Sequence, residues 1–341
     1  YVVNQAQAIA SIKNAVAQAE KSSGTKIKRA FVALSGATLR GEQSTGSAII
    51  SKADGEVTAL DVSKALEDAE DNLNLGNKKI IHAYPVSYRL DGKEVPGRIE
   101  GMRGTKLEIK ALFITYSLVH LEDLLSAVAE AGIETIGVVA APVSAESLCL
   151  AEKQKIVGVA LVDIGSEKSS VAVFENGELQ SLHTFAIGSS DITNDIALGL
   201  KIPLEQAENL KRGSADEEFP KKKLEEIVAA RLCDIFESID NHFKKIKRSE
   251  LLPAGVVWIG GGAATPGLLE LSKEILKLPS SLGTTEVWGN TKTKLRDSSW
   301  FPALGLISSG KSGQSFSAGT LESLLRDLKN AVKGGLKQLM P

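Results

Sequence analysis

The sequence predicts an α/β protein of more than one domain, and three observations support this class. The chain has 341 residues, enough for two or three domains of about 100 to 200 residues each. Its composition, with 43% hydrophobic and 24% charged residues, is that of a globular chain that buries a sizeable core. Segments with apolar residues at helical spacing alternate along the chain with short apolar runs that are typical of strands.

Charge and cysteine usage exclude several classes of function. The 40 basic and 42 acidic residues leave a formal net charge of -2, so no overall field favours nucleic acid, and we expect no nucleic-acid partner. Cys149 and Cys233 are far apart and the four histidines are scattered, which argues against a disulfide framework or a zinc site. The sequence has no transmembrane-length apolar run and no signal-peptide pattern, so the cytoplasm is the expected location. The chain begins with Tyr1 instead of Met, and we expect further sequence before it.

The first half of the chain predicts two groups of helices and strands. Apolar residues over 5–20 have helical spacing, Gly24 is a stop signal, and 29–34 is typical of a strand. Thr58 can cap a second helix because Asp61 follows three residues later. The elements that complete a compact module over 52–136 are strands over 80–88 and 106–115 and a helix over 121–128.

A buried hairpin and a long amphipathic helix are predicted in the second half. The apolar run 157–163 ends in Asp163, and 171–174 is the expected partner strand. Helical spacing persists through the charged segment 212–250, so we predict an amphipathic helix with a solvated charged face. The last expected elements are a strand over 255–259, a Gly/Ser linker over 308–319 and a helix from Thr320.

The turn of the predicted hairpin is a candidate phosphate site. In D-I-G-S-E-K-S-S (163–170), backbone N–H groups around a glycine turn can surround a phosphate, and Asp163 can hold a hydrated Mg²⁺. The alternative is a plain hairpin with an aspartate in its turn.

A glycine-rich loop follows the strand over 255–259. In G-G-G-A-A-T-P-G (260–267), the glycines allow a ligand to approach the backbone, and Thr265 and Pro266 can begin a helix as N-cap and first residue. Thr265 stands where a dinucleotide-binding G-x-G-x-x-G pattern needs its third glycine, so that pattern is not met. The alternative is a tight packing turn.

Two further patterns have plain interpretations. Segment 305–312, G-L-I-S-S-G-K-S, matches the formal P-loop pattern, but a Gly/Ser linker follows it where a helix is needed, so we interpret it as a chance match. Glu208 and Lys211 lie one helical turn apart, and taken alone they are typical of an exposed ion pair.

Taken in order, these motifs resemble the FtsA family of bacterial actin-like proteins, which tether the FtsZ division ring to the membrane. The second phosphate hairpin of that family and the region after it are similar to V-G-V-A-L-V-D-I-G, I-G-S-S-D-I-T-N-D-I-A-L-G-L and A-E-N-L-K. Its adenosine motif is similar to V-V-W-I-G-G-G-A-A-T-P-G-L, and its first connecting helix to V-A-A-P-V-S-A-E-S-L. Its inserted domain 1C resembles V-T-A-L-D-V, I-I-H-A-Y-P-V-S-Y-R-L-D-G and G-M-R-G-T-K-L-E-I-K, so the resemblance covers essentially the whole chain.

The resemblance implies an α/β, actin-like (RNase H-like) two-lobed fold with an inserted 1C (SHS2-type) α+β domain. The implied domains are, in order, a partial domain 1A (1–51), the inserted domain 1C (52–136), the return of domain 1A with the connecting helix (137–158), domain 2A (159–200), domain 2B (201–253), the return of domain 2A (254–308), and a linker with an amphipathic tail helix (309–341).

The resemblance also implies a site for ATP and Mg²⁺. The residues expected near the phosphates are Asp163, Gly165, Ser166 and Lys168, with Asp163 holding Mg²⁺ through water. The residues expected near the ribose and adenine are Glu208 and Lys211, and those expected against the nucleotide are Gly260, Gly261, Gly262 and Ala263. Glu146, in the connecting helix, is the candidate catalytic residue that would position a water.

Two departures from the family pattern predict poor ATP binding and little or no hydrolysis. The first phosphate loop of the family would lie before Tyr1. In the second, G-S-E-K-S-S replaces the G-G-G-T-T-D that the family favours, so Glu167 brings a negative charge toward the phosphates and Ser170 removes a carboxylate, while Lys168 partly compensates. The protein is then at most a weak ATPase and primarily a binding and assembly protein.

Three partners follow from the resemblance: the C-terminal peptide of FtsZ at domain 2B, further copies of the chain in an actin-like filament, and an anionic membrane surface. The tail residues expected at the membrane are Leu324, Leu325, Leu328, Lys329, Val332, Lys333, Leu336 and Lys337. Their helical spacing and basic complement are typical of an interfacial helix, so we expect a peripheral protein on the inner face of the cell membrane at the division site. The alternative is a PilM-like actin-fold assembly platform of type IV pili. A sugar kinase of the same superfold would need a catalytic aspartate at a sugar pocket, for which the sequence has no motif.

Overall fold

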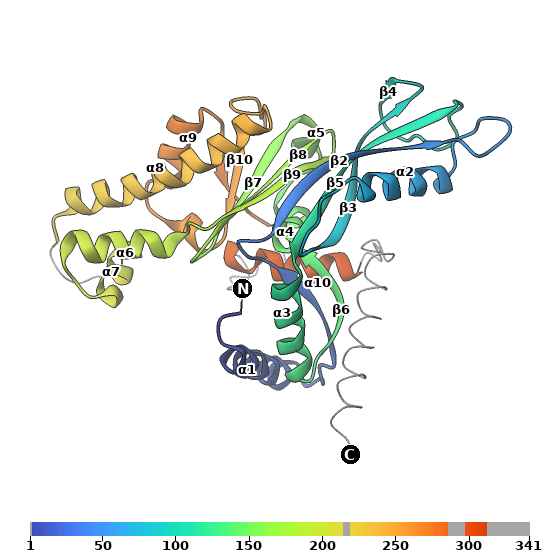
Figure 1. The fold of residues 1–341 in the computed structure, drawn as a ribbon. Coiled ribbons are helices and arrows are strands. Elements are labelled where there is room, and N and C mark those ends of the chain that lie inside the picture. Colours follow the sequence, from blue (N-terminus) through green and yellow to red (C-terminus); the bar gives the residue numbers. More distant parts are fainter. Residues whose placement is uncertain (1, 214–218, 286–296, 312–341) are drawn as a thin grey trace, which may run out of the picture. The chain divides into compact units, whose positions relative to one another are not determined.

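A computed structural model describes residues 2–213, 219–285 and 297–311 of the protein. The described chain divides into two compact units (Figure 1). The first contains residues 2–34 and 41–140, and the second contains residues 35–40 and 141–309. Each unit has its own hydrophobic core.

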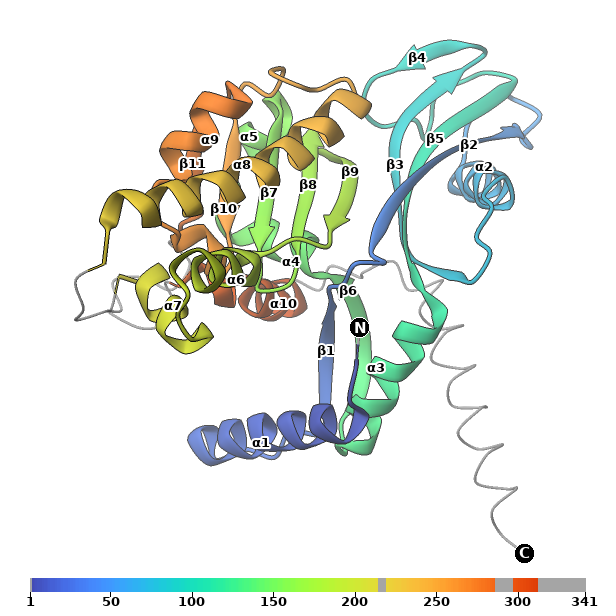
Figure 2. The ribbon, with the colours of Figure 1, turned by 60° about the vertical axis from the view of Figure 1, so that its left-hand side comes forward.

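One part of the first unit is a pair of parallel strands with two helices beside it (Figure 2). β1 (Arg29–Leu34) pairs in parallel with β6 (Glu134–Ala140). α1 (Gln5–Ser23) packs against α3 (Leu118–Glu130). The predicted stop of the first helix is confirmed, because Gly24 takes the left-handed conformation with φ 69°.

The other part of the first unit is a sheet covered by one helix. The strands, in their order across the sheet, are β2 (Arg40–Ile49), β5 (Lys106–Ser117), β3 (Lys78–Leu90) and β4 (Lys93–Val95). α2 (Ala59–Asp71) covers one face, where Leu107, Ile109 and Phe113 are buried in one cluster with Ala69 of the helix. The predicted alternation of the strand over 106–115 is confirmed, since its apolar residues line this core.

The start of α2 confirms the predicted cap. The Thr58 hydroxyl accepts a hydrogen bond from Asp61 N–H, and the Asp61 carboxylate accepts one from Thr58 N–H. Asp61 is buried and also accepts hydrogen bonds from the N–H and hydroxyl of Ser51, just after β2. The Thr58 hydroxyl contributes most, and together these donors outweigh burial and hold the pKa of Asp61 well below its usual range.

The sequence did not predict β2, because its residues R-G-E-Q-S-T-G-S-A-I are mostly polar. The helix beside it holds this strand. Ser47 N–H donates to Asp68 Oδ2 at 2.7 Å, and a Cβ on Gly46 would lie 2.2 Å from Ala69 N. A side chain at position 46 would therefore separate β2 from α2.

The second unit is built on a mixed sheet with the strand order β11, β10, β7, β8, β9. The strands are β7 (Val159–Ile164), β8 (Ser169–Glu175), β9 (Glu178–Phe185), β10 (Val256–Ile259) and β11 (Ser280–Leu282). β7, β8 and β9 pair antiparallel in sequence, whereas β10 pairs in parallel with both β7 and β11. The hairpin predicted around Asp163 is confirmed.

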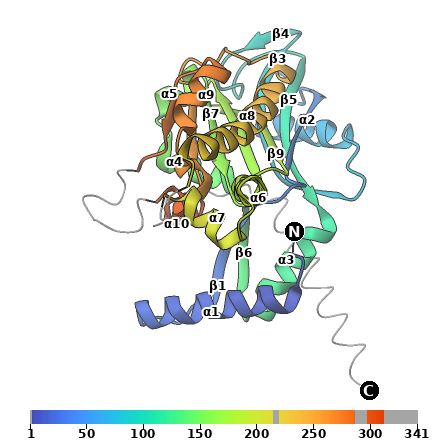
Figure 3. The same cartoon turned by 90° about the vertical axis from the view of Figure 1, so that its left-hand side faces the viewer.

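Helices cover both faces of this sheet (Figures 2 and 3). Four helices lie on one face: α6 (Ser189–Leu200), α7 (Leu204–Lys211), α8 (Lys221–Lys245) and α9 (Leu268–Leu276). On the other face, α4 (Ala141–Cys149) packs against β7 and β8. The remaining elements are α5 (Glu152–Val157), η1 (Gly261–Ala264), η3 (Ser298–Trp300) and α10 (Phe301–Lys311). No helix of the described segments is long and apolar enough to cross a membrane.

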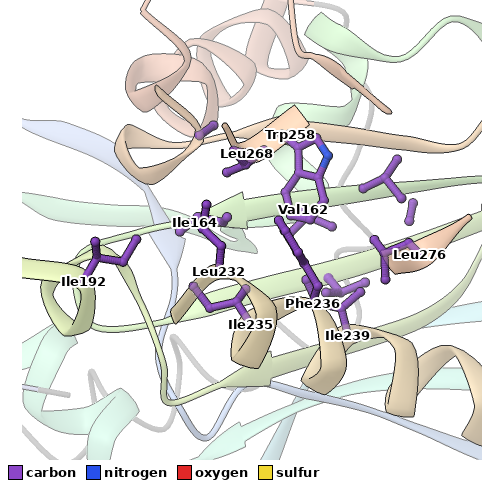
Figure 4. Close-up of a cluster of buried hydrophobic side chains, with 14 of the residues drawn as sticks. Val162, Ile164, Ile192, Leu232, Ile235, Phe236, Ile239, Trp258, Leu268 and Leu276 are labelled. Carbon is purple, nitrogen blue, oxygen red and sulfur yellow. The ribbon is translucent and has the colours of Figure 1, made fainter. Parts of the chain in front are cut away.

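The core of the second unit lies between the sheet and α8 (Figure 4). Val162 and Ile164 of β7 and Trp258 of β10 are buried with Leu232 and Phe236 of α8. The rings of Phe236 and Trp258 meet edge to face with their centroids 5.3 Å apart. The amphipathic helix predicted within 212–250 is confirmed by the 25 residues of α8.

Two predictions about element ends are wrong. Thr265 does not cap a helix, because its hydroxyl donates to Gly262 O at 2.8 Å and closes the turn of η1. α9 begins only at Leu268, after Gly267 in the left-handed conformation. The linker expected from Ser308 begins as helix, because α10 continues to Lys311.

The P-loop-like segment is part of a helix as far as the structure describes it. Gly305 lies inside α10, and a Cβ on it would lie 1.7 Å from the carbonyl oxygen of Ser144 in α4. The glycine therefore allows two helices to meet closely, and a helix has no loop of N–H groups to surround phosphates. This geometry agrees with the interpretation of a chance match.

Candidate functional site

The carboxyl ends of the parallel strands β7 and β10 lie side by side, which is where open α/β sheets bind ligands. Asp163 pairs with Ile259, the last residue of β10. A Cβ on Gly260 would lie 2.2 Å from Asp163 Oδ1, and one on Gly262 would lie 2.3 Å from Ile164 Cγ2. The structure thus brings Asp163 and the glycine loop together, as the sequence predicted.

The glycines of this loop have different surroundings. The protein's own packing requires Gly260 and Gly262, whereas a Cβ on the exposed Gly261 would meet no atom within 4 Å. The side chain of Ala263 is 4% exposed and belongs to the hydrophobic core, so it does not face the surface of the loop. Of the four residues predicted in this motif, Gly261 is the one whose surface is open to a ligand.

The turn between β7 and β8 is compact and exposed. Gly165 N–H donates to Lys168 O at 2.8 Å, and Ser166 and Glu167 at the tip are exposed. Ser170 is buried in the sheet, where its hydroxyl shares a hydrogen bond of 3.2 Å with Thr184. The charge of Glu167 therefore stands at the exposed tip of the turn.

The first turn of α6 holds this hairpin in place. Ser189 N–H donates to Gly165 O and Ser190 N–H donates to Ser166 O, both at 2.9 Å. A Cβ on Gly188 would lie 2.2 Å from Ser166 O, so this position needs glycine. Sequence reasoning missed these contacts, although the I-G-S-S-D stretch before a helix was a signal for a tight turn.

Glu208 and Lys211 of α7 form a partly buried network, not the exposed ion pair of the plain interpretation. Lys211 Nζ lies 2.7 Å from Glu208 Oε2, and the lysine side chain is only 9% exposed. The Thr193 hydroxyl of α6 donates to Glu208 Oε2 at 2.6 Å. Burial opposes the ionisation of Glu208, but the hydrogen bonds from Lys211, Thr193 and Arg212 outweigh it and lower its pKa to about 2.

This network is joined to the hairpin through α6. Lys211 Nζ also donates to Ser189 O at 3.0 Å and to the Thr193 hydroxyl at 2.8 Å. Ser189 is the same residue whose N–H donates to Gly165 O. One turn of helix therefore fixes both the hairpin and the Glu208–Lys211 pair.

A cavity of about 570 Å³ opens beside Lys211. It lies between the end of α7, the start of α8 and the loop after η1, and its lining residues are Leu210, Lys211, Gly213, Lys221, Leu224, Glu225, Val228, Ala229, Pro266, Gly267 and Leu271. Mostly apolar walls with a few charged groups at the edge are typical of a small-molecule site. The cavity joins the Glu208–Lys211 network to the glycine loop.

Glu146 lies on α4, on the face of the sheet opposite α8. Burial raises the pKa of Glu146, and Lys155, whose Nζ is 3.9 Å from Glu146 Oε1, opposes this shift. Burial raises the pKa of Cys149 to about 12, and the charges of Glu146 and Asp163 add to this shift. Glu146 and Asp163 therefore act electrostatically on the same thiol.

Asp163 lies near the end of β7, and Lys168 in the same hairpin is the cation whose charge affects the pKa of Asp163. Burial raises the pKa of Asp163 and Lys168 opposes this shift; burial lowers the pKa of Lys168 and Asp163 opposes that. Within the described ranges, no group of three or more His, Cys, Asp or Glu side chains could hold a metal ion. Mg²⁺ keeps several waters and is bound by one or two carboxylates together with substrate phosphates, so Asp163 would hold it through water when a nucleotide is present.

The predicted membrane residues lie outside the described part of the chain. They are Leu324, Leu325, Leu328, Lys329, Val332, Lys333, Leu336 and Lys337.

Comparison with known families decides where this arrangement belongs. The family model "Cell division protein FtsA" matches residues 160–305, and the model "SHS2 domain inserted in FTSA" matches residues 36–115. The chain belongs to the FtsA family. It is an actin-like cell-division protein with an inserted SHS2 domain.

Relatives cover most of the chain. The cell division protein FtsA of Bacillus subtilis (strain 168) is 29% identical over 328 residues, which span 90% of this chain and 73% of that protein. The cell division protein FtsA of Pseudomonas aeruginosa is 26% identical and spans 92% of this chain and 80% of that protein. A solved chain of a PilM–PilN type IV pilus biogenesis complex superposes with a TM-score of 0.66 over 91% of this chain and 86% of that chain, at 15% identity. That likeness concerns the fold alone, so the FtsA assignment stands over the PilM alternative.

Proposed function

We propose that this protein links FtsZ filaments to the inner face of the cytoplasmic membrane at the division site and assembles with further copies of itself in a nucleotide-dependent way. Membership of the FtsA family supports this proposal. The site supports a binding role with little or no ATP hydrolysis. The observation that carries the nucleotide part is the cavity lined by Lys211, Pro266 and Gly267, because Lys211 is joined through α6 to the hairpin of Asp163 and Gly267 ends the glycine-rich segment that contains the open Gly261.

ATP is the ligand that this arrangement fits best. The exposed hairpin turn at Gly165–Lys168 and the open Gly261 would meet the phosphates, Glu208 and Lys211 would meet the ribose, and the apolar cavity would take the base. Glu146 would position a water if hydrolysis occurs. Glu167 at the tip of the hairpin repels phosphate charge, so we expect binding weaker than micromolar.

Gly261→Val tests this placement. The new side chain meets no protein atom at its Cβ, so the melting temperature should stay the same, while binding of a fluorescent ATP analogue should fall at least about tenfold. Ala264→Val, at an exposed position of the same short helix, is the matched control. Unchanged binding by Gly261→Val would place the nucleotide elsewhere.

The expectation of weak ATP binding is tested on the natural chain. A dissociation constant below about 1 µM, or about 8 kcal/mol, would contradict it.

The FtsZ C-terminal peptide is proposed to dock within residues 201–253, at the end of α8. Lys244 pairs with Asp240 and Arg248 with Glu175, each at 2.7 Å. In the described part of the chain, Lys245 and Lys247 have no carboxylate partner and are exposed. These two lysines are therefore unpaired cations at this end of α8 that an acidic peptide can reach.

Charge reversal at both positions tests the docking site. Lys245→Glu with Lys247→Glu should weaken binding of a fluorescent FtsZ C-terminal peptide and make the remaining affinity less sensitive to salt. Lys222→Glu with Lys223→Glu, exposed at the other end of α8, is the control. If only the control loses affinity, the docking site is at the start of the helix.

The membrane contact is proposed to lie in residues 320–341, on the sequence pattern of leucines and lysines alone. Each basic residue near an anionic surface contributes about 1 kcal/mol, so one chain should bind modestly and an assembly strongly. Deletion of 320–341 should abolish sedimentation with anionic vesicles and leave the melting temperature nearly unchanged, with neutral vesicles as the control. Persistent vesicle binding together with a much lower melting temperature would make the tail part of a core.

A further inference from the structure

We propose that the first unit binds a small hydroxylated molecule that carries a phosphate group, in a polar cavity formed by β2, β3, β5 and α2. All the residues that line this cavity belong to the first unit. The inference therefore does not depend on the nucleotide site proposed for the second unit, and it goes beyond the proposed function, which makes no use of this surface.

The cavity has a volume of about 500 Å³, which lies within the range of small-molecule sites. Apart from Gly46 and Ile109, every residue that lines it is polar or charged. The cavity beside Lys211 has mostly apolar walls, so the two cavities suit different ligands. A lining with charges of both signs favours a ligand that is itself polar and charged.

One wall of the cavity is made by side chains of β3 and β5. Alternate residues of β5 are apolar and line the core with α2, so Lys106, Glu108 and Lys110 project from the opposite face. In the pairing of the two strands, Arg89 lies opposite Glu108, and Ser87 lies opposite Lys110. Because residues directly opposite each other share a face, this wall carries three basic side chains, one carboxylate and a hydroxyl.

Two of the three cations on this wall have no partner. Lys106 Nζ lies 2.8 Å from Glu108 Oε1, whereas Arg89 and Lys110 make no ion pair or hydrogen bond with any residue of the described ranges. A phosphomonoester carries a charge of about −1.5 to −2 at pH 7 and has three acceptor oxygens. It therefore matches two unpaired cations better than a single carboxylate does, and the hydroxyl of Ser87 is a further donor within the same cavity.

The other wall offers acceptors. Asp68 of α2 accepts from Ser47 N–H at its Oδ2, at 2.7 Å, and Asn72 of α2 donates from Nδ2 to Thr45 O at 3.1 Å. These bonds hold both side chains against β2 and leave Asp68 Oδ1 and Asn72 Oδ1 without a donor in the described part of the chain. A ligand hydroxyl can donate to these oxygens, while the charge of Asp68 directs the phosphate to the opposite wall.

Calorimetric titration of the full chain with glucose 6-phosphate tests the inference. We expect a dissociation constant below about 1 mM, or more than about 4 kcal/mol. Arg89→Gln and Lys110→Gln each remove one unpaired cation from an exposed position, and each should weaken binding at least about fivefold, or about 1 kcal/mol. Lys93→Gln, exposed on β4 and outside the lining of the cavity, is the control and should bind normally.

Two further ligands separate the parts of the proposed molecule. Glucose lacks the phosphate and inorganic phosphate lacks the hydroxylated part, so each should bind the natural chain at least about tenfold more weakly than glucose 6-phosphate. Equal binding of either one overturns the inference. So does normal binding of glucose 6-phosphate by both Arg89→Gln and Lys110→Gln, or no binding by the natural chain.

Gly261→Val shows which unit holds the ligand. This substitution lies in the loop of the proposed nucleotide site, so it should leave binding of glucose 6-phosphate unchanged. If it abolishes that binding, the sugar phosphate occupies the nucleotide site, and the inference is overturned while the proposed site stands. If ATP fails to bind the natural chain but glucose 6-phosphate binds with the expected effects of Arg89→Gln and Lys110→Gln, the proposed nucleotide site fails and the inference stands.

Discussion

Two stacked histidines form a polar contact within the second unit. His183 of β9 and His242 of α8 lie with their ring centroids 4.8 Å apart and their planes 21° apart, and the Ser181 hydroxyl is 2.9 Å from His242 Nε2. Burial lowers the pKa of each histidine to about 4, and the nearby charges of Arg40 and Lys245 add to this shift. Both rings are therefore neutral at pH 7.

The histidine pair predicts a loss of stability in mild acid. The unfolded chain takes up these protons near pH 6.5 and the folded chain only near pH 4, so the free energy of unfolding should fall as the pH drops from about 6.5 toward 4, with up to two protons involved. Urea denaturation at pH 7 and pH 5 measures this fall. His242→Gln should reduce the pH dependence, and His120→Gln, in the other unit, should not. A natural chain equally stable at both pH values would contradict the expectation.

At the scale of elements, the contact between η1 and β7 determines which substitutions the loop accepts. A Cβ on Gly262 would lie 2.3 Å from Ile164 Cγ2, whereas a Cβ on Gly261 would meet nothing within 4 Å. The two positions are adjacent, yet one is an internal contact between elements and the other is surface.

We therefore expect opposite results from two alanine substitutions in this loop. Gly262→Ala should lower the free energy of unfolding by about 1 to 3 kcal/mol through overpacking, and Gly261→Ala should change it by less than about 0.5 kcal/mol. Guanidinium denaturation of both variants gives the comparison. Equal losses would mean that the loop does not pack on Ile164 as described.

At the scale of the whole molecule, each of the two described units carries a hydrophobic core of its own. Phe113 is fully buried in the core of the first unit, and Phe236 is fully buried in that of the second. Units with their own cores generally unfold as separate cooperative blocks.

Scanning calorimetry should accordingly resolve two transitions. Phe113→Ala and Phe236→Ala should each remove about 3 to 5 kcal/mol from one unit and so lower one transition while leaving the other in place. Each variant is the control for the other. A single transition that both substitutions lower would show that the units unfold together.

Local patterns predicted much of this fold. The hairpin at Asp163, the cap at Thr58 and the length of α8 depend on residues close in sequence, whose spacing determines which side chains are buried. β2 was not predicted because its polar residues are held by contacts with α2.

The sequence predicted which residues belong to the candidate site, but not the hydrogen bonds and packing contacts that join them. The sequence placed Asp163 with the glycine loop, which the pairing of β7 with β10 brings together. It could not show that Lys211 donates to Ser189, or that the side chain of Ala263 points into the core, because both depend on how α6, α7 and η1 pack in three dimensions.

The loop after β10 also bears on how this sequence can change over generations. Asp163 and Ile164 require Gly260 and Gly262, so a lineage that had ceased to bind any ligand would still retain both glycines as long as it folded. Gly261 meets no atom of the described chain at its Cβ, so nothing in that part of the chain would keep a side chain from appearing there. Among descendants of this gene, a substitution at position 261 with Gly260 and Gly262 retained would therefore indicate that the ligand had been lost. Retention of Gly260 and Gly262 would indicate only that the protein still folds.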